Sequence, residues 1–322
     1  MNTIGDKYID LVRRSEASKQ LGRDVEKGLS HAYMLVSPDR LGLDVLTDLF
    51  VAAASGVEDA YRRVCSGTLT DVITLPENDG KVTVRDIDFL TETAYITPTE
   101  LDRKFYVISF GETMNEAAQN KLLKTLEEPP SVTMIIIKTA SESAMLPTVR
   151  SRCRIVELKP FALGELNEVI DLLYAGNTRL PVARAANRGM ISEAERLISG
   201  EIYSEMYELV VDMLKNMRRS SDIARFASRI LKYKDNIADI LEYIELLLRD
   251  CFAVTAMKPY LALNEAGITD TREISKSYAP EVVIRIMPLL TRARSRLKLN
   301  GNAAGMVDEL LFSMLEVKSK WK

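Results

Sequence analysis

The sequence of 322 residues predicts a doubly wound α/β domain with a parallel sheet, followed by helical domains. Five short apolar runs occupy the first half, and several are nearly continuous Val, Ile, Leu and Met. That pattern is typical of strands covered on both faces. Helical patterns separate the runs, and the strand pattern disappears after Pro160. The expected domains are 1–160, 161–202 and 203–322.

Each strand is expected from its apolar run and from the turn residues that bound it. The five predicted strands are Tyr33–Val36, Val72–Leu75, Phe105–Phe110, Met134–Lys138 and Ile155–Leu158.

The helices between these strands are expected from their caps and their spacing. Thr83 to Asp86 has the form of a capping box, followed by apolar residues at helical spacing. Asn115 is placed to cap a second helix, and Pro129 with Pro130 ends it. Strands that alternate with helices predict the doubly wound domain.

The second half reads as helix alone. Leu166–Tyr174 and Pro181–Ile198 are expected to form a small helical domain. Longer amphipathic segments then predict a helical bundle, and the clearest begin at Ser204, Ala238, Glu281 and Met306.

Composition limits the classes of function. The formal net charge is −3, whereas a protein that binds nucleic acid mainly through its own phosphate contacts usually has a clear basic excess. Any DNA contact is therefore expected to be shared or indirect. The start lacks a signal-peptide pattern, and no run is long enough to span a bilayer, so a cytoplasmic protein without membrane contact is expected.

The turn after the first strand is where such a domain would carry a phosphate-binding loop. Fitting GxxxxGK[ST] to the turn puts Ser37 at the first glycine, Gly42 at the second, Leu43 at the lysine and Asp44 at the hydroxyl. Leu43 carries no charge, and Asp44 would repel a phosphate group. The sequence therefore predicts a degenerate, inactive nucleotide site.

The end of the third strand should supply an acid that holds magnesium. Ser109 and Phe110 stand there instead, and the first acid, Glu112, comes late. A metal ligand and a water-activating acid are therefore not expected at this strand end.

Three stretches together carry a resemblance to a known family. "SHAYMLVSP", "MNEAAQNKLLKTLEEPP" and "LPTVRSRCR", in this order, resemble the clamp-loader ATPase family. This AAA+ group includes the gamma/tau and delta-prime subunits of bacterial DNA polymerase III and the replication factor C subunits. The resemblance implies a RecA-like AAA+ domain, a helical lid domain and a helical collar that joins subunits.

The resemblance also implies a role for one arginine. Arg152, between Ser151 and Cys153 of the family's "SRC" motif, is implied to be an arginine finger that reaches the ATP of a neighbouring subunit. A guanidinium group suits this role because it stays charged and can neutralise charge on a transferred phosphoryl group. Arg150 and Arg154 have no implied role.

Departures from the family pattern indicate which kind of member this is. The phosphate-loop lysine and the strand-end acids are missing, and a lid arginine expected near Ser192 is missing too. This pattern is similar to delta-prime, the kind of subunit that supplies a finger without hydrolysing ATP. Many relatives hold zinc with four cysteines, but this chain keeps Cys65 alone there, so neither zinc nor another cofactor is expected.

Two smaller features have simpler interpretations. Cys153 as a nucleophile would need a nearby base, and His31 is the only histidine, so a partly buried thiol is expected. Arg292, Arg294 and Arg296 fit a solvated helix surface better than a binding patch, since only the first and last share a face.

The leading hypothesis is a clamp-loader subunit that is not catalytic by itself, although membership of the holoenzyme would class it with DNA-directed DNA polymerases. Its implied partners are gamma/tau-type ATPase subunits and the delta subunit, with the sliding clamp and primed DNA contacted through the complex. Two alternatives stay open. One is a divergent, active AAA+ ATPase, and the other is a structural collar scaffold whose finger has lost its role.

Overall fold

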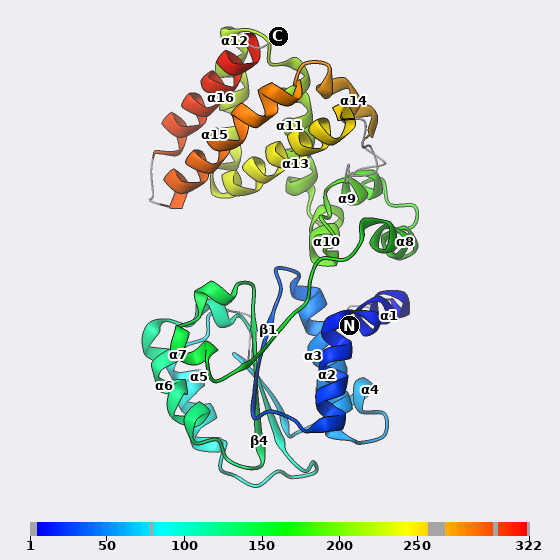
Figure 1. Ribbon diagram of the computed structural model, residues 1–322, viewed down its shortest axis with the longest axis vertical. Coiled ribbons are helices and arrows are strands. Elements are labelled where there is room, and N and C mark those ends of the chain that lie inside the picture. The colour runs from blue at the N-terminus through cyan, green and yellow to red at the C-terminus, as the bar shows by residue number, and fades with distance from the viewer. Residues whose placement is uncertain (1–4, 78–79, 257–267, 299–301, 321–322) are drawn as a thin grey trace. The chain divides into compact units, whose positions relative to one another are not determined.

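The computed structural model describes residues 5–77, 80–256, 268–298 and 302–320. The chain divides into two compact units (Figure 1). The first comprises residues 1–169 with 189–192, and the second comprises 170–188 with 193–322. The three-domain division of the chain stays a prediction. None of the described helices is both long and apolar enough to cross a membrane.

A five-stranded parallel sheet forms the centre of the first unit. Its strand order is β2-β3-β4-β1-β5, and Tyr33 of β1 pairs with Ile136 of β4 on one side and with Arg154 of β5 on the other. The three central strands are almost wholly buried, as their continuous apolar runs predict. The strands are β1 (Ala32–Val36), β2 (Val72–Leu75), β3 (Lys104–Ile108), β4 (Thr133–Thr139) and β5 (Arg154–Glu157).

Helices cover both faces of this sheet (Figure 1). One face carries α1 (Asp6–Arg14), α2 (Glu16–Lys27), α3 (Arg40–Ser55) and α4 (Ala60–Cys65). The other carries α5 (Val84–Thr93), α6 (Glu116–Glu127) and α7 (Pro147–Arg150), with short 3₁₀ turns at Gly111–Thr113 and Glu142–Ala144. The expected doubly wound domain is confirmed.

The predicted caps are present in the first unit. The Thr83 backbone amide donates to Oδ2 of Asp86 at 2.6 Å, which forms the expected capping box of α5. The side chain of Asn115 accepts from the Ala118 amide at 2.9 Å and so begins α6. Since Pro129 and Pro130 lack amide hydrogens, the helix ends at Glu127, as predicted.

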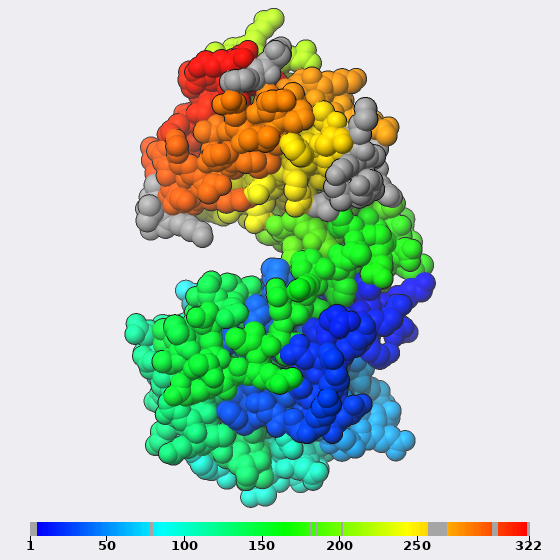
Figure 2. All heavy atoms as spheres, in the orientation of Figure 1, coloured from blue at the N-terminus to red at the C-terminus, as the bar shows by residue number. Residues whose placement is uncertain are grey.

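The second unit is helical throughout its described residues, which confirms the expected class. Helices α15 and α16 lie side by side in it (Figure 1, Figure 2). Its helices are α9 (Leu180–Ala186), α10 (Ile191–Ser199), α11 (Glu201–Asn216), α12 (Ser220–Ile230), α13 (Ile237–Thr255), α14 (Ile268–Ser275), α15 (Pro280–Lys298) and α16 (Ala303–Lys320), with a 3₁₀ stretch at Leu231–Asn236; α8 (Leu163–Leu173) and the start of α10 extend into the first unit.

One predicted helix was wrong in extent. Pro181–Ile198 is two helices, α9 and α10, because Arg188 and Gly189 between them have positive φ angles of 52° and 80°. Gly189 also packs so closely that an added Cβ would lie 2.4 Å from the carbonyl oxygen of Phe161. A glycine is therefore required at this break.

Asp71 fixes the loop that leads into β3. It is 1% exposed, and its carboxylate accepts from the backbone amides of Thr99, Glu100 and Leu101 at 2.7–2.9 Å. Burial opposes ionisation of Asp71, but these three amides outweigh it and hold the pKa of the carboxyl below its usual value.

We expect Asp71→Ala to lower the free energy of unfolding by about 2–3 kcal/mol at neutral pH, because three amides lose a charged acceptor. A depressed folded pKa gives stability that is present above the unfolded pKa and lost as pH falls through the folded pKa. The difference from wild type should therefore shrink below about pH 4. Urea denaturation across pH measures it. Asp102→Ala, at an exposed neighbour, is the control. A pH-independent difference would contradict the account.

Candidate functional site

The turn between β1 and α3 holds the residues expected to form a degenerate phosphate loop. Ser37 is buried, and its amide donates to the carbonyl oxygen of Thr139 at the end of β4. The Ser37 hydroxyl accepts from the amide of Asp39, whose own side chain caps α3 by accepting from the Gly42 amide at 3.2 Å. The expected strand, turn and helix are thus present, and the chain's own side chains satisfy the turn.

The carboxylate of Asp39 takes the place where an anion would bind. It is 2% exposed and accepts four hydrogen bonds. Oδ1 accepts from the amides of Gly42 and Ser192 at 3.2 and 3.1 Å, and Oδ2 accepts from the Tyr8 hydroxyl and the Ile191 amide at 3.0 Å each. Free amides at a helix N-terminus are the usual ligands of a phosphate group. Here the first turns of α3 and α10 donate to a side-chain carboxylate instead.

Packing closes the same place further. A Cβ on Gly42 would lie 2.9 Å from Cδ2 of Leu158 and 3.0 Å from the Tyr8 hydroxyl oxygen. Burial, reinforced by the charge of Asp39, raises the pKa of Tyr8 well above its ordinary value, so Tyr8 remains a neutral donor. The glycine that matches the loop pattern therefore serves close packing around Asp39.

The two positions that would carry the lysine and the hydroxyl of a phosphate loop differ in their exposure to solvent. Leu43 is buried in the core, whereas Asp44 is half-exposed and forms a 2.5 Å ion pair with Lys138 of β4. Lys138 is thus paired with a carboxylate of the same chain. A phosphate would have to displace that carboxylate to use the lysine.

The end of β3 likewise carries no free acid. Ser109 and Phe110 follow the strand, and Phe110 has the left-handed φ angle of 59° that side chains rarely adopt. Glu112, the late acid, pairs with Arg40 at 3.2 Å and accepts from the Ala140 amide at 3.1 Å. The Arg40 guanidinium also lies 4.6 Å from the centre of the Phe110 ring. These contacts already engage the carboxylate that would otherwise be available to a magnesium ion.

A cavity of about 680 Å³ brings most of the expected site residues together. Leu43, Asp44, Ser109 and Phe110 line it, together with Lys138. Ser37 is not among its lining residues, and Gly42 faces Tyr8 and Leu158.

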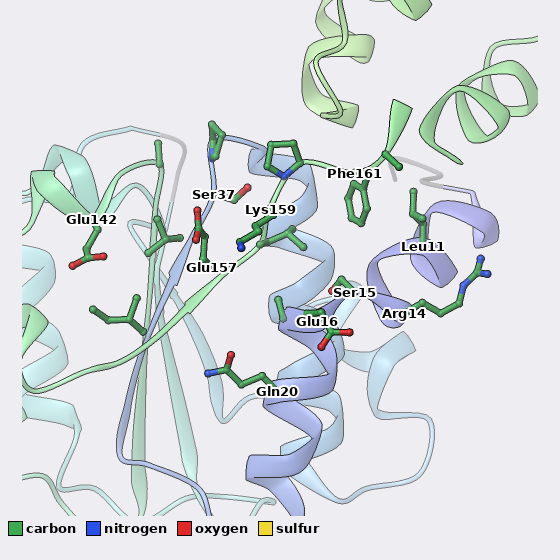
Figure 3. A pocket seen from close by; sticks show the side chains of 18 of the residues that line it. Leu11, Arg14, Ser15, Glu16, Gln20, Ser37, Glu142, Glu157, Lys159 and Phe161 are labelled. Atoms are coloured by element: carbon green, nitrogen blue, oxygen red, sulfur yellow. The ribbon is translucent and has the colours of Figure 1, made fainter. Parts of the chain in front are cut away.

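Ser37 instead lines a second cleft, of about 950 Å³, at the ends of β1 and β5 (Figure 3). Figure 3 shows Glu157 and Lys159 on its β5 side, with Glu16 and Gln20 on α2. Four glutamates line it against one arginine and one lysine, an excess that disfavours a polyphosphate. This cleft was not predicted from the sequence.

Arg152 lies at the surface between α7 and β5. Its side chain is 35% exposed. Nη1 donates to the carbonyl oxygen of Thr148 at 2.9 Å, and Nη2 pairs with Oε1 of Glu127 at 2.6 Å. Ser151 is exposed beside it and donates to the same carbonyl. The arginine is therefore oriented and still open to solvent.

The residues around Arg152 have structural partners. Arg150 pairs with Glu142 at 3.0 Å, and Arg154 pairs with Asp24 of α2. Cys153 is partly buried, as expected, and packs against the core. Burial raises the pKa of its thiol to about 12, so the reactive thiolate is disfavoured at neutral pH.

Gln119 is a positioning residue that the sequence did not reveal. It is buried on α6, where its Nε2 donates to the carbonyl oxygens of Met114 and Ala144. Its Oε1 accepts from the Leu146 amide at 2.7 Å. These contacts tie α6 to the loop that leads into α7. A polar residue on the core side of a helix was the available sign.

Cys65 is the one cysteine in the region where many relatives hold zinc. It is exposed, and its thiol donates to Oδ2 of Asp48 at 3.6 Å. Among the residues described, no three or more His, Cys, Asp and Glu side chains gather closely enough to hold a metal ion. The absence of zinc stays a prediction.

The arginines of α15 contact different neighbours in the second unit. Arg294 pairs with Glu245 of α13, and Arg296 pairs with Glu309 of α16. Arg292 is exposed. This arrangement fits the expected solvated helix surface, with two of the three charges neutralised locally.

Comparison with known proteins gives matches to subunits of DNA polymerase III. Residues 13–162 match the family described as "DNA polymerase III, delta subunit". The chain is 25% identical to the DNA polymerase III subunit delta' of Bacillus subtilis over 92% of its length and 95% of that protein. It is 24% identical to subunit tau of the same organism over 91% of its length, but it spans only 58% of that relative.

Further matches are shorter or more distant. A delta' subunit of Pseudomonas aeruginosa is 33% identical over 38% of this chain and 42% of its own. Among solved structures, a gamma subunit-related protein of Thermotoga maritima aligns over 94% of this chain and 100% of its own, at 16% identity and a TM-score of 0.49.

We expect Asp39→Ala to lower the free energy of unfolding by about 3 kcal/mol, because three amides and the Tyr8 hydroxyl lose a buried charged acceptor. Asp39→Asn, which keeps one acceptor oxygen, should cost less. Asp44→Ala removes a half-exposed carboxylate from the next turn and should cost at most about 1 kcal/mol. Urea denaturation compares the three variants. Equal losses for Asp39→Ala and Asp44→Ala would contradict the role given to Asp39.

Proposed function

Because this chain belongs to the delta', gamma and tau family of DNA polymerase III clamp-loader subunits, we propose that it acts there without hydrolysing ATP itself. It supplies Arg152 to the ATP site of a neighbouring gamma/tau-type subunit. The delta subunit is its other partner, and it reaches the sliding clamp and primed DNA through the assembled complex. The similarity to relatives named tau, gamma and delta' supports other DNA polymerase III subunits as its partners.

The observation that carries this proposal is the buried carboxylate of Asp39 at the start of α3. A bound phosphate there would meet a negative charge that already uses the amides of α3 and α10. Two basic side chains of the cavity are also paired internally, since Asp44 pairs with Lys138 and Glu112 pairs with Arg40. These internal contacts support a site that does not carry out phosphoryl transfer.

Arg152 supports the second part of the proposal. It lies outside the degenerate site and is open to solvent, so its guanidinium can reach a group on another molecule. An arginine placed in this way stabilises the charge that develops as ATP is cleaved.

The active-ATPase alternative is tested by nucleotide binding. In isothermal titration calorimetry, we expect the isolated chain to give no saturable heat with magnesium and ATP, because Asp39 repels the phosphate and retains its amides. A gamma/tau-type subunit under the same conditions is the positive control. Tight, magnesium-dependent binding by this chain would overturn the proposal and favour a divergent ATPase.

The scaffold alternative is tested by removal of the finger. Arg152→Ala should cut the DNA-stimulated ATPase of the reconstituted complex, since comparable fingers contribute about 10³–10⁵ in rate at the site that they serve. Assembly of the complex, measured by gel filtration, should be unchanged because Arg152 is a surface residue. Arg154→Ala, which removes the next arginine along the chain, is the matched control. Unchanged turnover with Arg152→Ala would favour a scaffold.

A further inference from the structure

We propose that Glu127 is a positioning residue for Arg152, a role that rests on the function proposed above. Glu127 holds the guanidinium at the surface in one orientation before a neighbouring subunit's ATP arrives. The pair joins the C-terminal end of α6 to the segment between α7 and β5, through Nη2 of Arg152 and Oε1 of Glu127 at 2.6 Å.

Two contacts from different elements fix the orientation of this guanidinium group. Nη1 donates to the carbonyl oxygen of Thr148 in α7, and Nη2 contacts Glu127 in α6. Since the group is planar, two such contacts define the direction of its remaining edge. A guanidinium has five N–H donors, so these contacts leave donors for phosphate oxygens.

Glu127 is itself placed rigidly. It is the last residue of α6, and the neighbouring Leu126 and Leu122 are buried in the core. Pro129 and Pro130 follow and restrict the backbone beyond it. The buried amide side chain of Gln119 also ties α6 to the loop before α7. The carboxylate therefore stands on a fixed support, as a positioning group must.

Helix stability does not explain a carboxylate at this position. The C-terminal end of a helix carries partial negative charge, so an acid there is mildly unfavourable. Removal of Glu127 should leave α6 as stable as before or slightly more so. Glu128, the next residue, is exposed and forms no ion pair with any residue that the structure describes. It therefore offers a control of the same charge at almost the same place.

Pre-orientation matters because an arginine side chain otherwise samples many rotamers. Without Glu127, ordering the Arg152 side chain would cost conformational entropy and so offset part of the free energy of its contact with the phosphate. Arg152 and Glu127 are 35% and 50% exposed, so water screens their attraction and the effect should be modest. It should act on the rate of the chemical step, because the finger contacts the charge that develops there.

The experiment is a double-mutant cycle in the reconstituted clamp-loader complex, read out as DNA-stimulated ATPase. Glu127→Ala should lower kcat about two- to five-fold with little change in KM for ATP. Glu127→Gln, which keeps an acceptor oxygen, should retain more activity, and Glu128→Ala should match wild type. In the Arg152→Ala background, Glu127→Ala should cause no further loss, because its effect passes through the arginine.

Other outcomes would overturn the inference. A higher kcat with Glu127→Ala would mean that the carboxylate competes with the phosphate, and an equal loss in both backgrounds would mean a general structural defect. Thermal unfolding of Glu127→Ala, expected at the wild-type temperature, tests folding separately. If Arg152→Ala lowers turnover but Glu127→Ala does not, this inference alone fails. If Arg152→Ala has no effect, the proposed function fails first.

Discussion

The carboxylate of Asp39 satisfies donors from three separate parts of the chain. It joins the start of α3, the start of α10 and the hydroxyl of Tyr8 in α1. Each donor would otherwise be buried without a partner, at a cost comparable to losing a hydrogen bond. The turn after β1 and the buried Tyr8 hydroxyl both rely on this carboxylate as a hydrogen-bond acceptor.

Charges near the same edge of the sheet follow a similar rule. Lys138 is held by Asp44, and Arg40 is held by Glu112 and lies over Phe110. Two basic side chains that line this cavity are thereby paired with carboxylates of the same chain. Arg152 lies at a different place, between α7 and β5, where it is paired with Glu127 and stays 35% exposed.

Much of the fold could be predicted because it depends on local patterns. All five strands lie within two residues of their apolar runs, and the caps of α5 and α6 depend on residues three apart in sequence. The break between α9 and α10 was missed because helical periodicity continues across Arg188 and Gly189. Gly189 is needed there for its packing against Phe161, which only the folded chain reveals.

The candidate site was predictable in what it lacks and less so in what replaces it. The missing lysine and acid are visible at Leu43 and Phe110, but Asp39 looks like an ordinary helix cap in the sequence. Its importance comes from partners 31 and 152 residues away. The sequence likewise shows Glu127 only as part of the "LEEPP" stretch, because its contact with Arg152 depends on the folded chain.

The internal anion at Asp39 also bears on how this domain responds to the energy state of the cell. A domain that binds a nucleotide only when folded gains stability as the nucleotide concentration rises. A tethered carboxylate has a constant effective concentration, so it contributes the same stability whatever the ratio of ATP to ADP.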